Sequence, residues 1–354
     1  MLLINLKIKI MLFEFITMKD PHLSFGFQNR IRKNYEKDVL QKLEFVKGYC
    51  KEKHIKNVLF TGDVFDSSAE DKWSFKKYRK NKRVLENFKN QGLTLYSNVG
   101  NHDMFHGYEE SNDTIFGEMV HDNILNNITK SPLIIQEENA FIKIQGIDYS
   151  NENNIVHEKI RQFDEESYPG YNVYKIAVLH SNVTPKTVEK ITDFTYKSLT
   201  EDFPDIDMFI LGHYHVGYDT TIVKRENGKQ VIFINNWNFT RVVRDYEVEL
   251  DEHTPEFEHI QIQYDKINKI FIPHIENIQI PFVPYQKAFS AKDIDILKKS
   301  KKEIFDFFDN IDFEAVKDDS KKGDESLVEK IVENNGFDKE SMECSLEYLN
   351  NAKG

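Results

Sequence analysis

Apolar and polar residues alternate along this chain with two different periods, which predict strands and helices in turn. Short apolar runs of the kind that form buried strands occur at residues 12–18, 57–61, 93–99, 173–179 and 208–211. Between the first two runs, residues 35–53 place Val39, Leu43, Val46 and Cys50 on one helical stripe opposite Lys and Glu. Residues 72–90 show a second helical pattern. This rhythm predicts βαβ units and an α/β fold.

After residue 217 the pattern becomes that of β-strands alone. Alternating runs occur at residues 220–223, 231–235, 246–250 and 259–264, with a turn at residues 226–229. We expect these strands to form a second sheet that completes a domain over residues 1–270. Pro273, Pro281 and Pro284 mark a connector. Charged helical segments then predict a C-terminal region over residues 271–354, with helices from residue 293, at 326–333 and at 340–349.

Composition limits the class of protein. The 354 residues, 40% apolar and 13% aromatic, suit a folded protein with one large domain and an appendage, or with two domains. Two cysteines provide neither a disulfide framework nor a thiolate zinc site, so we expect a reducing compartment and a cytoplasmic location. We expect no membrane span, because no apolar run reaches about 18 residues. Residues 1–12, interrupted by Lys7 and Lys9, predict an edge strand or an extension before Met11.

The net charge of the chain does not identify its substrate. The net charge of -12 argues against nucleic-acid binding through a global basic field, but a local basic groove remains compatible with it. The second helical region is densely basic, with Lys76, Lys77, Arg79, Lys80, Lys82 and Arg83. This density suits either a solvated helix face or a patch that contacts a polyphosphate backbone.

The candidate chemistry lies where predicted strands end. Gly62-Asp63, Gly100-Asn101-His102 and Gly212-His213-Tyr214-His215 each follow an apolar run. Gly62 permits backbone angles that other residues resist, and it delivers Asp63 to the carboxyl end of a strand, where open α/β sheets bind ligands. One such junction is ordinarily a turn. Three junctions that release metal-binding side chains are rarely a coincidence.

Two further histidines and one aspartate extend this set. Asp20 and His22 follow the first strand, and His180 follows residues 173–179. In extended chain, residues two apart point the same way, so we expect the pair Asp20 and His22 to reach one ion and the pair His213 and His215 to face one cleft. Each signal alone is more often a surface or hydrogen-bonded residue. Together they predict one site.

The ligand types define the chemistry. Imidazole and oxygen ligands without thiolate suit manganese, iron or zinc, and a carboxylate shared by two ions about 3.5–4 Å apart suits Asp63. Two such ions hold phosphate oxygens and lower the pKa of water, so the predicted reaction is phosphoester hydrolysis. We assign His102 to the leaving group or transition state rather than to a metal.

The motifs Asp-x-His, Gly-Asp, Gly-Asn-His-Asp, His and Gly-His-x-His occur in order over residues 20–215. This series resembles the calcineurin-like metallophosphoesterase superfamily. The resemblance implies a two-sheet sandwich flanked by helices. It also implies a first ion bound by Asp20, His22, Asp63 and His215, and a second bound by Asp63, Asn101, His180 and His213. His102 would assist the departing oxygen.

Within the superfamily, the motif variants favour one branch. Protein Ser/Thr phosphatases carry Arg-Gly where Ser67-Ser68 follow Asp66, and purple acid phosphatases carry a tyrosine ligand that is missing near Phe65. The forms Gly-Asp-Val-Phe-Asp and Gly-Asn-His-Asp look most like SbcD-type DNA repair and recombination nucleases, including short bacteriophage versions. Some of those relatives have His where Asp66 stands, a position thought to steer duplex-end cleavage.

The SbcD-type resemblance implies a substrate, a metal and partners. Such enzymes use manganese, degrade DNA ends 3′ to 5′, cut single strands internally, form homodimers and work with an SbcC-like coiled-coil ATPase. Residues 293–354 would grip that ATPase, although an amphipathic tail that packs on its own domain fits the pattern as well. Two alternatives stay open: a small-molecule or nucleotide phosphodiesterase, and a non-catalytic recombination scaffold.

Overall fold

The computed structural model describes residues 11–23, 35–66, 75–104, 114–188, 191–240 and 254–283. The chain divides into two units, Met1–Phe289 and Ser290–Gly354. The second unit lies outside the described residues, as do the predicted strand at 246–250 and the predicted C-terminal helices. The division at residue 270 and the role of the C-terminal region therefore stay predictions. All further description concerns the first unit.

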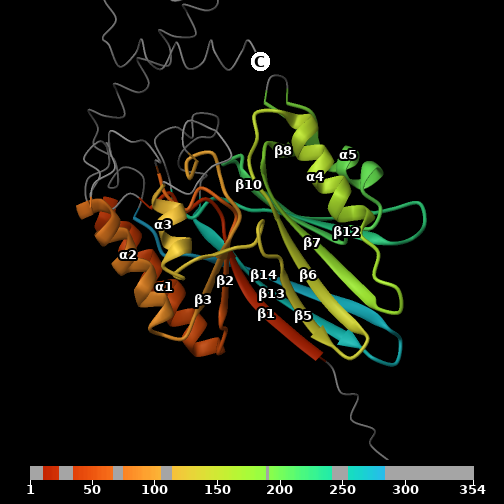
Figure 1. The fold of residues 1–354 in the computed structure, drawn as a ribbon, viewed down its shortest axis with the longest axis horizontal. Helices are drawn as coiled ribbons and strands as arrows, with labels where there is room; N and C mark the ends of the chain where they lie inside the picture. The colour runs from red at the N-terminus through yellow and green to blue at the C-terminus, as the bar shows by residue number, and fades with distance from the viewer. Residues whose placement is uncertain are drawn as a thin grey trace, which may run out of the picture. The chain divides into compact units, whose positions relative to one another are not determined.

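Two six-stranded sheets form this unit (Figure 1). Sheet 1 has the order β14-β13-β1-β2-β3-β4, and sheet 2 the order β11-β12-β10-β7-β6-β5. The strands of sheet 1 are β1 (Met11–Met18), β2 (Asn57–Phe60), β3 (Thr94–Ser97), β4 (Asn126–Asn127), β13 (Glu256–Asp265) and β14 (Ile270–Gln279). Those of sheet 2 are β5 (Leu133–Glu137), β6 (Ala140–Ile147), β7 (Asn172–Ser181), β10 (Met208–His213), β11 (Tyr218–Lys224) and β12 (Gln230–Asn235). A small separate pair joins β8 (Val183–Thr184) and β9 (Phe194–Thr195).

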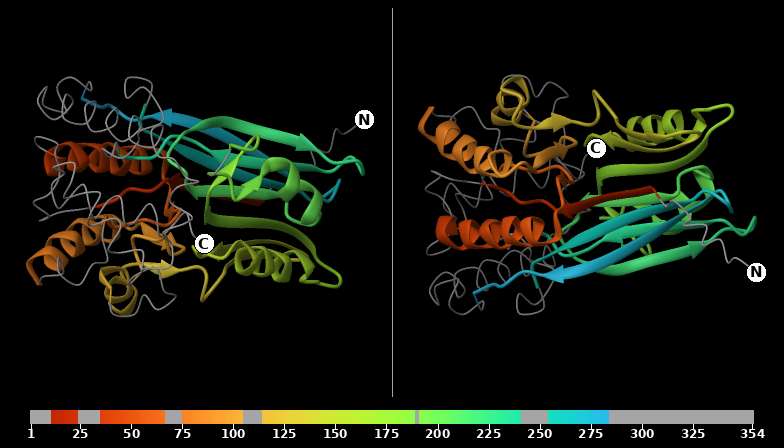
Figure 2. Two further views of the ribbon diagram at one scale, coloured as in Figure 1. Left: turned by 90° about the horizontal axis from the view of Figure 1, so that it is seen from above. Right: turned by 90° about the horizontal axis from the view of Figure 1, so that it is seen from below.

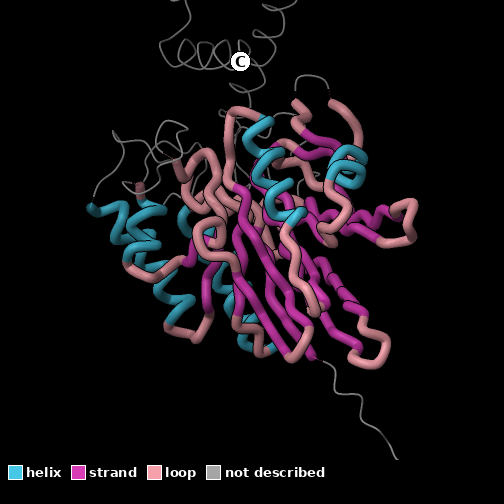
Figure 3. Tube along the Cα trace, turned by 45° about the vertical axis from the view of Figure 1, so that its right-hand side comes forward, coloured by secondary structure: helices cyan, strands magenta, loops and turns pink. Residues whose placement is uncertain are grey.

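Helices cover the outer face of each sheet (Figure 3). They are α1 (Tyr35–Lys53), α2 (Phe75–Lys89), α3 (Ile115–His121), α4 (Asn153–Glu165) and α5 (Tyr196–Asp202). The predicted stripe of α1 packs on sheet 1 as expected, with Val39, Leu43, Val46 and Cys50 buried in one cluster with residues of α2 and α3. Residues of α4 and α5 form a second cluster with sheet 2.

The alternation of side chains along each strand builds the layers. In β2, Leu59 packs between the sheets, while Val58 and Phe60 face the helices. In β10, Ile210 packs between the sheets, while Leu211 joins the α4 and α5 cluster. Both faces of these strands are apolar because both are covered. The predicted α/β sandwich of two sheets flanked by helices is confirmed.

Parallel strands at the centre of each sheet bring several strand ends to one edge. β1, β2, β3 and β4 run parallel in sheet 1, and β6, β7, β10 and β12 run parallel in sheet 2. Parallel strands share the direction of their carboxyl ends, so the loops after them gather at the same edge. The residues predicted to bind metal all follow or end these parallel strands.

Two predictions about the later strands are wrong. β13 belongs to sheet 1 and not to a second sheet with β12, because it pairs antiparallel with β1 from Thr17↔Glu258 to Met11↔Tyr264 (Figure 2). Pro273 lies inside β14 and not in a connector. β14 is the edge strand of sheet 1, where the missing N–H of proline costs no ladder hydrogen bond. The sheet therefore continues past residue 270 to Gln279.

None of the helices in the described ranges is both long and apolar enough to cross a bilayer.

Sheet 1 buries an acidic residue away from the predicted metal ligands. Glu258 of β13 is 1% exposed and accepts a hydrogen bond from the Thr17 hydroxyl of β1. Burial raises its pKa from 4.5 to about 8, and neighbouring Glu256 adds to the rise while Thr17 and Lys19 oppose it. Between these two values the folded protein keeps a proton on Glu258 that the unfolded chain releases. Stability from this group is therefore lost as pH rises through that window.

We predict that Glu258→Gln, which mimics the protonated acid, removes this part of the pH dependence. The fall in unfolding free energy between about pH 5 and about pH 8 should shrink by roughly 1–3 kcal/mol, since one pKa unit corresponds to about 1.4 kcal/mol. Urea unfolding in the presence of a chelator measures it. Glu226→Gln, an exposed residue of the β11–β12 turn, is the matched control. An unchanged pH dependence in Glu258→Gln would contradict the assignment.

Candidate metal centre

The eight predicted ligand and catalytic residues come together at the carboxyl edge of the two sheets. Asp20 and His22 follow β1, Asp63 follows β2, and Asn101 and His102 follow β3. From sheet 2, His180 lies near the end of β7, His213 ends β10, and His215 follows it. Asp20, His22, Asp63 and His180 are at most 1% exposed, whereas Asn101, His102, His213 and His215 are half-buried. The site therefore has a buried floor and an accessible rim.

The backbone at this edge is left-handed at four predicted ligands. Asp20, His22, Asp63 and His213 have φ of 41°, 44°, 44° and 83°. The expectation that Asp20 and His22, and also His213 and His215, lie in extended chain is therefore wrong, although the side chains still reach one site. Non-glycine residues with such angles cost free energy and cluster at functional sites. This clustering was not visible in the sequence.

The first group of predicted ligands surrounds His22. His22 Nε2 lies 3.1 Å from His215 Nε2 and 3.7 Å from Asp63 Oδ2. His215 Nε2 lies 4.0 Å from Asp20 Oδ2. These contacts connect the four side chains predicted to bind the first ion.

The second group surrounds Asn101. Its Oδ1 lies 3.0 Å from His213 Nδ1 and 3.2 Å from His180 Nε2. His180 Nε2 is also 3.4 Å from Asp63 Oδ2. Asp63 therefore faces both groups. In the second group, His180 and His213 come from sheet 2, whereas Asp63 comes from sheet 1.

Two sets of residues in the described part of the chain have the geometry to hold a metal ion. They are His22 with Asp63 and His102, and Asp63 with His180 and His213, each with its ligand atoms within 4.8 Å of one another. Asp63 is common to both sets, as a bridging carboxylate must be. His102 falls within reach of the first ion, which the sequence did not suggest, and its role in proton donation stays a prediction.

The protonation of His180 tests whether a cation fits. Its Nδ1 lies 2.7 Å from the carbonyl oxygen of Thr61, which can only accept, so Nδ1 carries the hydrogen. A neutral His180 then presents the Nε2 lone pair to Asn101 Oδ1 and Asp63 Oδ2. Three electron-pair donors that face one another are held together by a cation, which is either a proton on Nε2 or a metal ion, and this mixture of nitrogen and oxygen suits a divalent ion.

The electrostatics agree with this requirement. Burial alone would lower the pKa of His180, but the carboxylates of Asp63 and Asp20 raise it to about 9. Burial alone would raise the pKa of Asp63, but His180 and His102 hold it well below its usual range. Burial raises the pKa of Asp20. The site thus favours positive charge beside Asp63, which two divalent ions would supply.

Glycines allow the two sheets to meet at this edge. A Cβ at Gly62 would lie 2.5 Å from His180 Nδ1, and a Cβ at Gly212 would lie 2.2 Å from the Thr61 carbonyl oxygen. Both contacts join sheet 1 to sheet 2, and real Cβ atoms do not approach other atoms this closely. The sequence analysis explained Gly62 by its backbone angles, which is confirmed by its φ of 86°. The close approach at Gly212 is a second reason that only the structure reveals.

Asp103 is a positioning residue whose role the sequence did not suggest. This buried carboxylate accepts backbone hydrogen bonds from Phe65 at 3.0 Å, Gly100 at 3.1 Å and Val64 at 3.2 Å. It therefore ties the loop that carries Asp63 to the loop that carries Asn101. Its place as the last residue of the Gly-Asn-His-Asp motif was the available signal.

Lys19 is a second residue that the sequence analysis missed. It is fully buried next to Asp20, and its Nζ donates to Asn235 Oδ1 at 2.6 Å and to the Asn236 carbonyl at 2.9 Å. Its own carbonyl accepts from the Phe239 N–H at 2.7 Å. Lys19 thus joins the end of β1 in sheet 1 to the segment after β12 in sheet 2. A lone lysine between a strand and an aspartate gave no sign of this.

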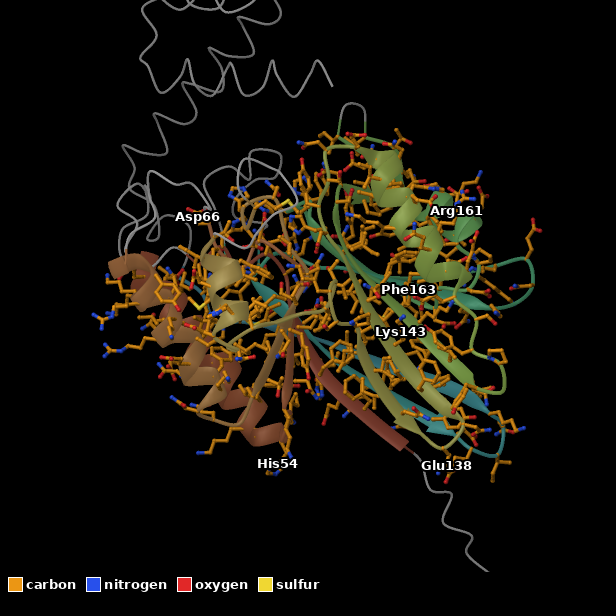
Figure 4. The ribbon with its side chains drawn as sticks, in the orientation of Figure 1. His54, Asp66, Glu138, Lys143, Arg161 and Phe163 are labelled. Atoms are coloured by element: carbon orange, nitrogen blue, oxygen red, sulfur yellow. The ribbon has the colours of Figure 1, made fainter. Side chains whose placement is uncertain are left out.

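His102 and Asp66 lie at the outer side of the first group. His102 Nδ1 donates to the Asp66 carbonyl at 2.7 Å, and its backbone N–H donates to Asp63 Oδ1 at 2.9 Å. The Asp66 carboxylate lies 3.9 Å from His22 Nδ1 and is 21% exposed. Figure 4 shows Asp66 and His54 at opposite ends of the helical side of sheet 1. The predicted steering residue therefore lies at the rim of the site.

We predict that Asp63→Asn empties at least one metal site. The amide keeps the size of the side chain and an oxygen for the His102 N–H, but a neutral amide does not bridge two cations as a carboxylate does. Metal analysis after dialysis against manganese measures ions bound per chain. Asp219→Asn, in an exposed position of β11, should keep full occupancy. Two ions retained by Asp63→Asn would contradict the bridge.

Comparison with solved structures shows weak similarities. A protein assigned as a 5′-nucleotidase from Staphylococcus aureus, in complex with alpha-ketoglutarate, is 13% identical with a TM-score of 0.44, and the match covers 83% of this chain and 58% of that chain. The calcineurin-like phosphoesterase YfkN from Bacillus subtilis is 10% identical with a TM-score of 0.48, and the match covers 84% of this chain and 99% of that chain. Neither similarity identifies a substrate. No curated protein matches this chain.

A family comparison covers more than half of the sequence. The family described as calcineurin-like phosphoesterase matches residues 20–217, which is 198 of the 354 residues and runs from the first predicted ligand, Asp20, to just past the last, His215. Members of this family hydrolyse phosphoesters with divalent metal ions. The chain belongs to the calcineurin-like phosphoesterase family and is a metal-dependent phosphoesterase.

Proposed function

We propose that this protein is a DNA nuclease of the SbcD type, with 3′ to 5′ exonuclease and single-strand endonuclease activity. The observation that carries the proposal is the placement of Asp66 at the rim, with its carbonyl bound to His102 and its carboxylate beside His22. Some SbcD-type relatives carry His at this position, which is thought to steer duplex-end cleavage, and we assign the same place to Asp66 although its side chain differs. Asp66 contacts both His22, a predicted ligand, and His102, the predicted proton donor. This position suits a polymeric substrate that enters over the rim of the site.

Helix α2 supports a polyanionic substrate. It follows the loop of Asp66 and therefore begins at the same edge of sheet 1 as the site. Arg79, Lys80 and Arg83 are exposed on it, although Lys80 lies 3.2 Å from Glu36. The chain as a whole has a net charge of -12. The positive charges of α2 therefore create a local positive potential, which attracts phosphates to this edge. This supports the second of the two interpretations that the sequence left open.

The chain's own residues suggest how the reaction proceeds. Asp20, His22, Asp63 and His215 would hold one ion, and Asp63, Asn101, His180 and His213 the other. When bound, the two ions polarise the phosphate and lower the pKa of the attacking water. Thr61 fixes the tautomer of His180, and the Asp66 carbonyl fixes Nδ1–H of His102. His102 then offers a proton from Nε2, in its protonated form, to the departing oxygen.

The finer assignments belong to the same proposal. We infer manganese as the native ion, a homodimer, an SbcC-like coiled-coil ATPase as partner and a bacteriophage origin. The nitrogen and oxygen ligands suit manganese, although zinc and iron accept the same set. The segment proposed to bind the ATPase lies beyond the described residues.

We predict that the purified protein, with manganese, releases nucleotides from a labelled DNA duplex end and nicks single-stranded DNA, and that a chelator abolishes both. Gel electrophoresis of end-labelled DNA measures this, with cyclic nucleotides and bis(p-nitrophenyl) phosphate as parallel substrates. Hydrolysis of the small diesters without any DNA cleavage would contradict the nuclease assignment and favour a nucleotide phosphodiesterase. Binding of DNA without hydrolysis of any diester would favour a scaffold.

We also predict that His102→Ala leaves both ions bound but lowers turnover by about 10²–10⁴, the usual contribution of a positioned proton donor. Metal analysis and initial rates measured on the same preparation distinguish this role from ligation. His54→Ala, at the opposite end of sheet 1, should leave the rate unchanged (Figure 4). A wild-type rate for His102→Ala would exclude proton donation, and loss of an ion would make His102 a ligand.

A further inference from the structure

Tyr149 is an aromatic residue at the rim that none of the motifs includes. Its ring centroid lies 5.1 Å from that of His213 and 6.2 Å from that of His180. Both histidines belong to the second group of predicted ligands. Tyr149 is half-buried and also packs against the apolar cluster of sheet 1 and its helices.

The backbone holds Tyr149 in place from sheet 1. Its N–H donates to the Val99 carbonyl at 3.0 Å, and the Val99 N–H donates to Asp148 Oδ1 at 2.7 Å. Asp148 Oδ1 also accepts from the Thr129 hydroxyl at 2.5 Å. Residues 148 and 149 are thus attached to the chain just before Asn101. A ring supported in this way loses little further freedom when it binds a ligand.

The Tyr149 hydroxyl does not serve the metal centre. It donates to Asn151 Oδ1 at 2.5 Å, and Asn151 is exposed. The ring is tilted by 48° to His213 and by 77° to His180, so it is stacked on neither imidazole. An anchored aromatic surface beside the ions, with its polar atom engaged elsewhere, is suited to an apolar or aromatic part of the substrate.

We propose that Tyr149 is a stacking surface for the nucleobase adjacent to the phosphate that is cleaved. The inference rests on the proposed nuclease function, because a phosphate at the ions brings a neighbouring base to their rim. Stacking on an aromatic side chain is tolerant of sequence, since every base has a π-face. This is the recognition that a nuclease without sequence preference needs. The competing role is purely structural support of the His213 ring.

Two oligonucleotides test the proposal with the full-length protein and manganese. Both are single strands in which phosphorothioates block every linkage except one. One carries normal nucleotides on both sides of that linkage, and the other carries abasic tetrahydrofuran residues there. The quantity measured is kcat/KM for that single linkage, together with the manganese bound per chain.

Wild-type protein should prefer the normal oligonucleotide by about five- to tenfold, the lower range for one stacked base. Tyr149→Leu should lose the same factor on the normal strand and less than about twofold on the abasic strand, with manganese binding retained. Tyr149→Phe should behave as wild type. Tyr171→Leu is the matched control, because Tyr171 is 45% exposed just before β7, away from the end of that strand where His180 lies.

Two results would overturn the inference separately from the proposed function. An equal loss on both strands, or a wild-type protein without preference for the normal strand, would leave Tyr149 as structural support only. If Tyr149→Leu does not fold, Tyr149→Trp replaces it and should keep or increase the preference for the normal strand, whereas loss of that preference contradicts stacking. Hydrolysis of bis(p-nitrophenyl) phosphate with no cleavage of either strand overturns the nuclease function and this inference together.

Discussion

The metal centre depends on the contact between two sheets at the carboxyl ends of their parallel strands. Three ligand-bearing loops come from sheet 1, and the strands that end near His180 and at His213 come from sheet 2. The sheets approach so closely that a Cβ at Gly62 would meet His180, and a Cβ at Gly212 would meet Thr61 and Asp20. Any side chain at these glycines would push the two edges apart. The shared carboxylate of Asp63 could then no longer face ligands from both sheets.

Buried polar groups stabilise the contact between the two sheets and the strained backbone of the ligand loops. Residues in the left-handed region cost roughly 1–3 kcal/mol each, and they persist only where the surroundings over-determine them. Here Asp103 bonds three backbone N–H groups across two loops, and Lys19 bonds the segment after β12. The backbone N–H of His213 also donates to Asp20 Oδ2 at 2.8 Å. The predicted ligands, the buried residues Asp103 and Lys19, and the left-handed backbone therefore depend on one another.

The sequence was sufficient to predict which residues gather at this edge, because a polar residue just after an apolar run is a local signal. The same locality explains the correct bounds of α1 and the approximate places of eight of the predicted strands, whereas β5, β6, α3, α4 and α5 were not predicted. Features that depend on distant partners were not accessible: the pairing of β13 with β1, the place of Pro273 in an edge strand, and the anchoring of Tyr149 by Val99. The period of two placed these residues at one site through a wrong geometry, since left-handed backbone at Asp20, His22 and His213 replaces the extended chain.

The most direct test of this arrangement is a crystal structure of the protein grown with manganese, with data collected at the manganese absorption edge. We expect two anomalous peaks about 3.5–4 Å apart, as in other two-metal sites, with the Asp63 carboxylate bound to both. One peak should contact His22 and His215, and the other His180 and His213. A single peak, or two peaks that do not share Asp63, would contradict it.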